Sequence, residues 1–136
     1  MVARQKTWVY APKKQKKPVV PEDLKDFAEE KARLLVDNVL KPEYVKPPEE
    51  GDTSSYLVDI FTKWYRNYLY FCGMRHCRAP NCITEFYEQK FARMEYVGDG
   101  RFNLAYMRHT EQWWETHVGV DLDECLNEVQ KNIFFY

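Results

Sequence analysis

Hydrophobic side chains recur at helical spacing near both ends of the sequence. Between residues 21 and 40 they follow steps of three and four, which predicts an amphipathic helix with one buried stripe: Leu24, Ala28, Ala32, Leu35 and Val39. Pro21 suits the first helical position, and Pro42 is expected to end the helix. Residues 120–133 predict a second helix, with Asp121 as N-cap and Glu124 three positions later. Its stripe is Leu122, Cys125, Leu126, Val129 and Ile133.

From Tyr56 onward the hydrophobic period changes to two, which is typical of β-strands. The runs YLVDIFTKW and YLYFCGMR, separated by Tyr65-Arg66-Asn67, predict a hairpin. Residues 85–109 contain two further alternating runs, and WWETHV predicts a fifth strand. Prolines in residues 41–55 favour an irregular connector between the first helix and these strands.

Asp99-Gly100 lies between two alternating runs and predicts a two-residue type I′ turn. With this pair as the loop, one face of the hairpin is expected to pair Val97 with Phe102, Glu95 with Leu104, Arg93 with Tyr106, and Phe91 with Arg108. The other face would pair Tyr96 with Asn103, Met94 with Ala105, Ala92 with Met107, and Lys90 with His109. We expect this second face, rich in alanine and methionine, to receive a helix.

These elements together predict an α+β fold: an N-terminal helix, a five-stranded, mostly antiparallel meander sheet, and a C-terminal helix. Both helices are expected to cover one face of the sheet. We expect residues 1–20 to form an extended basic arm and residues 21–136 to form a single domain.

The formal net charge of −1 hides an asymmetry between the arm and the domain. Residues 1–18 carry a charge of +6 and the remaining residues −7, so an anionic partner is expected to meet the arm first. No apolar run is long enough to cross a membrane, and no signal peptide precedes the domain, so we expect a soluble, cytoplasmic protein. In such a compartment Cys72, Cys77, Cys82 and Cys125 are expected to be reduced thiols.

The stretch LAYMRHTEQWWE raises two alternatives. Arg108, His109 and Thr110 could belong to an active site, or they could close the end of a sheet; we favour the second because no nucleophile motif accompanies them. A small enzyme or small-molecule binder would use a polar sheet face, and its candidate residues are Arg93, Glu95, Arg108 and His109. A zinc site at Cys72, Cys77 and Cys82 would need Cys125, His76 or His109 as its fourth ligand. We assign no catalytic residue, metal or cofactor.

The arm is the strongest functional signal in the sequence. Two rings and six cations could anchor it and contact phosphates or carboxylates: Arg4, Lys6, Trp8, Tyr10, Lys13, Lys14, Lys16 and Lys17. The rings of the strands invite a base-stacking interpretation, among them Trp64, Tyr65, Tyr68, Tyr70, Trp113 and Trp114. Since the domain is acidic, we expect them to form the core instead.

The segments WVYAP, VDIFTKWYRNYLYF, FARMEYVGDGRFNLAYMRHTEQWWE and LDECL together resemble a small bacterial domain family of unknown function. This resemblance covers most of the chain and implies a single soluble domain, without an activity or site. We therefore predict a non-catalytic accessory protein that docks through its arm on a larger assembly. An RNA-rich partner such as the ribosome is the first hypothesis and an acidic protein surface the second. A third is a subunit that completes another sheet or dimerises through exposed rings.

Overall fold

The computed structural model describes residues 18–47 and 55–133. The helices are α2 (Glu22–Leu35), the π-helical turn η1 (Val36–Leu40), α3 (Lys41–Tyr44) and α4 (Leu122–Asn132). The strands are β1 (Tyr56–Tyr65), β2 (Tyr68–His76), β3 (Phe86–Gly98), β4 (Arg101–Met107) and β5 (Trp113–Asp121). The predicted α+β order is therefore confirmed, while the charged and aromatic side chains assigned to the arm lie outside the described residues.

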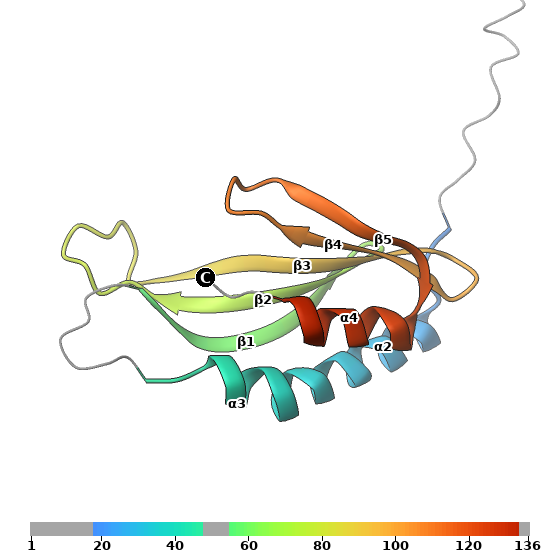
Figure 1. Ribbon diagram of the computed structural model, residues 1–136, viewed down its shortest axis with the longest axis horizontal. Coiled ribbons are helices and arrows are strands. Elements are labelled where there is room, and N and C mark those ends of the chain that lie inside the picture. The colour runs from blue at the N-terminus through green and yellow to red at the C-terminus, as the bar shows by residue number, and fades with distance from the viewer. Residues whose placement is uncertain (1–17, 48–54, 134–136) are drawn as a thin grey trace, which may run out of the picture.

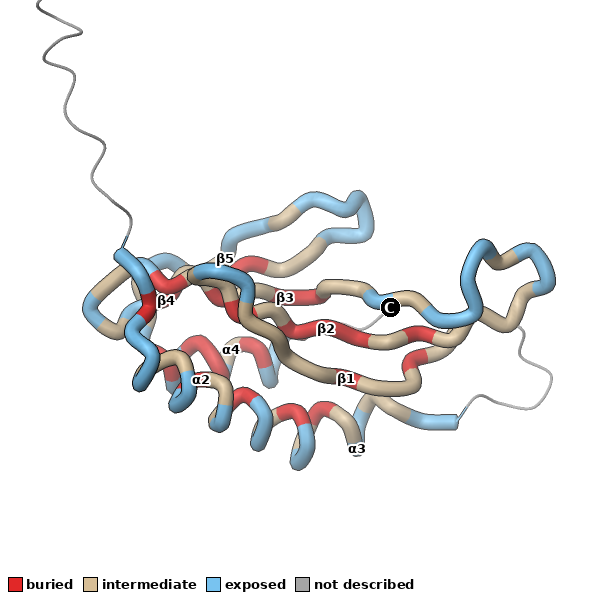
Figure 2. Tube along the Cα trace, turned by 180° about the vertical axis from the view of Figure 1, so that it is seen from behind, coloured by how far each residue is buried: buried red, intermediate tan, exposed pale blue. Residues whose placement is uncertain are grey.

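The five strands form one antiparallel meander in the order β1-β2-β3-β4-β5. Helices α2 and α4 lie side by side on one face of this sheet, as predicted (Figure 1). The core fills the space between them, and the buried segments face inward from both layers (Figure 2). No described helix covers the opposite face, which we call the open face.

The first helix continues past the predicted end at Pro42 and stops after Tyr44. Immediately before Pro42, the Lys41 N–H donates to the Val36 carbonyl oxygen, five residues back. This wider turn accommodates a proline, which has no N–H and whose ring crowds the preceding turn. The buried stripe runs through Val36 and Leu40, where the sequence predicted Leu35 and Val39; Leu35 is partly buried against the core.

The turn at Asp99-Gly100 is confirmed, but the predicted register beyond it is wrong. Both turn residues have positive φ, as a type I′ turn requires. Gly98 pairs with Arg101 and Tyr96 with Phe102, so Val97 is an extra residue in a β-bulge. The bulge shifts the pairing by one residue, and a shift of one exchanges the two faces of a strand.

As a result, β3 turns the predicted residues toward the helices, whereas β4 turns the opposite set toward them. Met94 and Ala92 face the helices as expected, opposite Leu104 and Tyr106. Phe102 is fully buried beside Tyr96, where the sequence predicted Asn103. The core of the hairpin is therefore larger and more aromatic than an alanine–methionine surface.

Helix α4 follows β5 directly and matches the prediction in detail. An Asp121 carboxylate oxygen accepts a hydrogen bond from the Glu124 N–H at 2.8 Å, which caps the helix. All five residues of the predicted stripe are buried.

In the part of the chain that the structure describes, neither this helix nor any other has the length and apolar character needed to cross a bilayer.

Candidate functional site on the open sheet face

The open face carries a row of partly exposed aromatic rings from three strands. Tyr68 and Tyr70 of β2 stack with their centroids 5.8 Å apart, and Tyr70 lies 6.0 Å from Trp113 of β5. Tyr65, at the end of β1, pairs with Tyr68 across the first hairpin and is 57% exposed. We call these four residues the ring row. Such a row exposes aromatic ring faces, the kind of surface on which bases stack.

Cationic side chains alternate with these rings. The Arg93 guanidinium lies 4.9 Å from the Tyr68 ring centroid and 4.5 Å from that of Trp113, so it bridges the two. The Lys90 ammonium lies 5.5 Å from the Tyr70 ring. These cation–π contacts position the rings and place positive charge beside their faces.

Carboxylates nearly balance these cations. Glu88 forms ion pairs with Lys63 and with Lys90, the latter at 3.7 Å, and its hydrogen bond raises the pKa of Lys63. Glu95 lies 3.4 Å from the Tyr68 hydroxyl, which donates to it. Arg66 adds a cation over the Tyr65 ring, and Glu115, opposite Ala105, adds a carboxylate. The face therefore offers stacking surfaces with little net charge.

This arrangement corrects the expectation that the strand rings form the core. Tyr68, Tyr70 and Trp113 face away from the helices. Of the six rings named in that expectation, Trp64 packs against the core. A signal for this was present in the sequence. The two-residue turn at Arg66-Asn67 pairs Tyr65 with Tyr68 and Lys63 with Tyr70, which places rings and a cation on one face.

The described end of the basic arm, residues 18–20, lies at one end of the ring row. The Asn67 side-chain N–H donates to the Pro18 carbonyl oxygen at 2.6 Å, and the Val20 N–H donates to the Asn67 side-chain oxygen at 3.0 Å. Asn67 lies in the turn that joins Tyr65 to Tyr68. The first described residue of the chain is therefore fixed beside the first two rings of the row.

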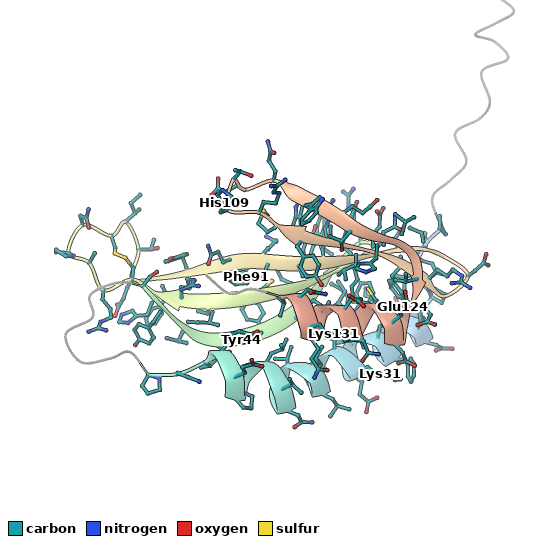
Figure 3. The ribbon with its side chains drawn as sticks, in the orientation of Figure 1. Lys31, Tyr44, Phe91, His109, Glu124 and Lys131 are labelled. Carbon is teal, nitrogen blue, oxygen red and sulfur yellow. A yellow bond between two sulfur atoms is a disulfide. The ribbon has the colours of Figure 1, made fainter. Side chains whose placement is uncertain are left out.

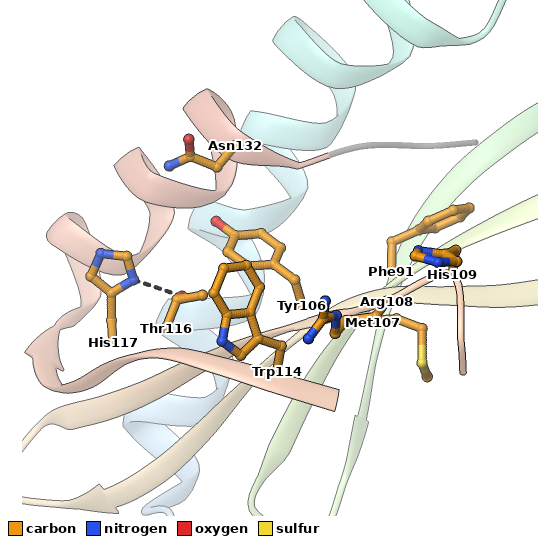
Figure 4. Close-up of a pocket in the computed structure, with 9 residues that line it drawn as sticks. All are labelled: Phe91, Tyr106, Met107, Arg108, His109, Trp114, Thr116, His117 and Asn132. Atoms are coloured by element: carbon orange, nitrogen blue, oxygen red, sulfur yellow. Dashed lines mark hydrogen bonds between the residues drawn. The ribbon is translucent and has the colours of Figure 1, made fainter. Parts of the chain in front are cut away.

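A pocket of about 420 Å³ opens on the opposite, helix-covered side of the sheet (Figure 4). It lies where the β4–β5 hairpin bends away from β3, near the end of α4. Apolar walls come from Phe91, Tyr106, Met107 and Trp114, and polar groups from Arg108, His109, Thr116, His117 and Asn132. The Trp113–Trp114 pair is thus divided, with one ring on each side of the sheet.

Inside this pocket a second β-bulge brings two neighbouring side chains of β5 to the same face. Leu104 pairs with His117 and Ala105 with Glu115, so Thr116 is the extra residue. Thr116 Oγ1 lies 2.8 Å from His117 Nδ1, and His117 Nε2 lies 3.6 Å from Glu128 Oε2. The sequence did not single out this chain of groups, because strict alternation would separate Thr116 from His117.

The four residues predicted for a polar ligand face do not meet at one site. Arg93 and Glu95 lie on the open face, whereas Arg108 and His109 line the pocket on the other side. Arg108 also begins the β4–β5 turn, where its carbonyl oxygen accepts from the Glu111 N–H at 2.8 Å. His109 is at the tip of this hairpin, well separated from α4 (Figure 3).

The cysteines differ in part from the expectation of four reduced thiols. Cys77 and Cys82 form a disulfide across the β2–β3 connection, with Cα atoms 6.3 Å apart. Loop closure within six residues brings them together, and the bond removes both from the ligands proposed for zinc. Cys72 and Cys125 are free and fully buried. Within residues 18–47 and 55–133, no three metal-binding side chains cluster.

Burial raises the pKa of both free thiols, Cys72 and Cys125, to about 12, from an ordinary 9.0. They therefore stay protonated in the folded protein at pH values where an unfolded chain ionises them. Since the unfolded state then binds fewer protons, we expect the free energy of unfolding to fall as the pH rises above about 9. Urea unfolding midpoints at pH 8 and pH 10 would measure this decrease. The double variant Cys72→Ala/Cys125→Ala should show a smaller decrease, and an equal one would contradict the assignment.

Comparisons with known proteins add a family but no activity. No curated protein matches the chain, and no solved structure does either. A family model described as a domain of unknown function (DUF3024) matches residues 19–136, which include every described helix and strand. The chain therefore belongs to the DUF3024 family.

Proposed function

We propose that this protein is a non-catalytic, RNA-binding accessory protein that docks on an RNA-rich assembly. The observation that carries the proposal is the ring row with its interleaved cations on the open face, joined at one end to the root of the basic arm. In this proposal unpaired bases stack on the rings, while the arm contacts phosphates.

The charges indicate what the open face and the arm would each contribute to RNA binding. The open face has almost as many carboxylates as cations, so it would contribute stacking more than electrostatic attraction. Base–aromatic stacking tolerates any sequence because every base has a π face. Residues 1–18 carry a charge of +6 and would supply the salt-dependent, sequence-independent part of the affinity.

The position of the arm root supports a continuous binding surface. Pro18 is held by Asn67 in the same turn that presents Tyr65 and Arg66. A strand of RNA leaving the ring row at Tyr65 would therefore reach Pro18, the described end of the arm, without crossing the helix layer. A cytoplasmic location goes with this proposal.

The test is the affinity of ring-row variants for a fluorescent single-stranded oligouridylate, measured by anisotropy at several salt concentrations. We expect Tyr70→Ala and Trp113→Ala each to weaken binding about 5- to 150-fold, because one stacked base contributes roughly 1–3 kcal/mol. The slope of log affinity against log salt should stay unchanged, since neither variant removes a cation.

Trp114→Ala is the matched control, because it removes the neighbouring, exposed tryptophan from the other side of the sheet. Its affinity for the oligonucleotide should equal that of the unchanged protein. Equal losses for Trp113→Ala and Trp114→Ala would contradict a binding site on the open face. Binding of a polyglutamate peptide in preference to RNA would instead favour an acidic protein surface as the partner.

A further inference from the structure

We propose that the pocket between the β4–β5 hairpin and the end of α4 binds a small aromatic carboxylate. The site is separate from the ring row, because it is lined by none of the four rings of that row and Tyr106, Trp114 and His117 face the helix layer. Its volume of about 420 Å³ lies in the range of small-molecule sites, which combine apolar walls with a few polar groups.

The walls suit a flat apolar body. Tyr106 and Trp114 are directly paired across β4 and β5 and present their rings to the same space, with Phe91 and Met107 opposite (Figure 4). The Trp114 side chain is more than half exposed, so a bound ring would cover apolar surface that now contacts water. Burial of that surface and ring–ring contacts would both stabilise the complex.

The two ends of the pocket differ in whether their polar side chains already form hydrogen bonds or ion pairs within the protein. At the α4 end, the Tyr106 hydroxyl donates to the Glu128 carbonyl oxygen at 2.9 Å, and burial raises the pKa of Tyr106, which keeps that proton in place. Asn132 donates to the Glu128 carboxylate at 2.9 Å, and His117 is held between Thr116 and Glu128. This end is therefore internally paired.

At the hairpin end the Arg108 and His109 side chains remain available for a ligand. The Arg108 guanidinium lies 5.4 Å over the Trp114 ring, and no described carboxylate forms an ion pair with it. The His109 ring lies close by at the hairpin tip and makes no hydrogen bond to another described residue. A guanidinium above an aromatic ring can pair with a carboxylate in two parallel hydrogen bonds while the ring holds its plane.

These two ends define the ligand: its ring would lie among Tyr106, Trp114 and Phe91, and its carboxylate would face Arg108. A neutral ligand of the same shape would leave the guanidinium without an anion. An acetate ion would pair with Arg108 but would leave the apolar walls uncovered. The site should therefore discriminate against both.

The experiment is a titration of the ¹⁵N-labelled protein with indole-3-carboxylate, indole-3-carboxamide and acetate, followed by amide chemical shifts. We expect indole-3-carboxylate to shift signals of β4, β5 and the end of α4. The carboxamide should bind at least about 10-fold more weakly, since a hydrogen-bonded charge contributes roughly 1.5–3 kcal/mol. Acetate should produce no saturable shifts.

Two variants localise the effect. Arg108→Gln should weaken indole-3-carboxylate binding at least about 10-fold but leave carboxamide binding unchanged, which a merely unfolded protein would not do. Arg93→Gln is the matched control, because it removes an arginine that contacts Trp113 on the open face, and it should leave the affinity unchanged. Equal binding of acid and amide, an unaffected Arg108→Gln variant, or shifts confined to the ring row would overturn the proposal.

Discussion

Replacing Phe102 by alanine is expected to lower the free energy of unfolding by about 3–5 kcal/mol. Phe102 is fully buried, its ring lies 5.6 Å from that of Tyr96, and it contacts the core beneath α2 and α4. Since a domain of this size is stable by only about 5–15 kcal/mol, one such cavity removes a large part of the total. Urea unfolding followed by circular dichroism would measure the change.

Asn103→Ala is the control for this prediction, because regular pairing from the Asp99-Gly100 turn would place Asn103 on the core face instead. In the structure Asn103 accepts a hydrogen bond from the Gly119 N–H at 2.8 Å and is only partly buried. Its loss should cost about 1 kcal/mol. A larger cost for Asn103→Ala than for Phe102→Ala would show that Val97 is not the extra residue of a bulge.

Reversing the charge of the four arm lysines should weaken binding to single-stranded RNA about 10²- to 10³-fold near 0.1 M salt. If each lysine contacts one phosphate of a single strand, the salt slope should fall by roughly 2.8, at about 0.7 per contact. The variant carries glutamate at Lys13, Lys14, Lys16 and Lys17. Its melting temperature should stay unchanged, because the core consists of residues 20–133. Anisotropy across a salt series measures the slope.

The matched control reverses four lysines of the helix layer and its flanks: Lys25, Lys31, Lys46 and Lys131. It makes the same change in net charge, so an equal loss of binding would show that overall charge, not the arm, is responsible. Gradient sedimentation of lysates extends the test to the cell. The unchanged protein should migrate with heavy particles until RNase treatment, and the arm variant should migrate as a small protein. Migration as a small protein in every sample would contradict docking on an RNA-rich assembly.

The ring-row and arm predictions separate two contributions that a single binding constant combines. Removing the ring of Tyr70 or of Trp113 should lower the affinity for RNA by the same factor at every salt concentration. Reversing arm charges should change the salt slope itself. A protein that used only its arm would lose affinity in the second set of variants and not in the first.

The candidate site shows where sequence patterns lose information. Period-two alternation correctly groups Tyr68 with Tyr70, but it does not say which face of the sheet the helices cover. That choice depends on summed burial across all five strands, where Ile60, Leu69, Phe71 and Met94 outweigh the rings. A pattern-based assignment of Tyr68, Tyr70 and Trp113 to the core is therefore wrong, because the open face receives them.

The sequence by itself determined the elements of this protein: two amphipathic helices, five strands in meander order, the turn at Asp99-Gly100 and the cap at Asp121. These follow from interactions between residues close in the chain, such as helical periodicity, turn conformation and capping. Only the tertiary structure decided the bulges at Val97 and Thr116, the continuation of the helix through Pro42, and the division of Trp113 from Trp114. Each of these depends on packing between distant segments. For the bulges, the local free-energy cost of one extra residue is small, so the register that buries the most apolar surface elsewhere in the fold is the stable one.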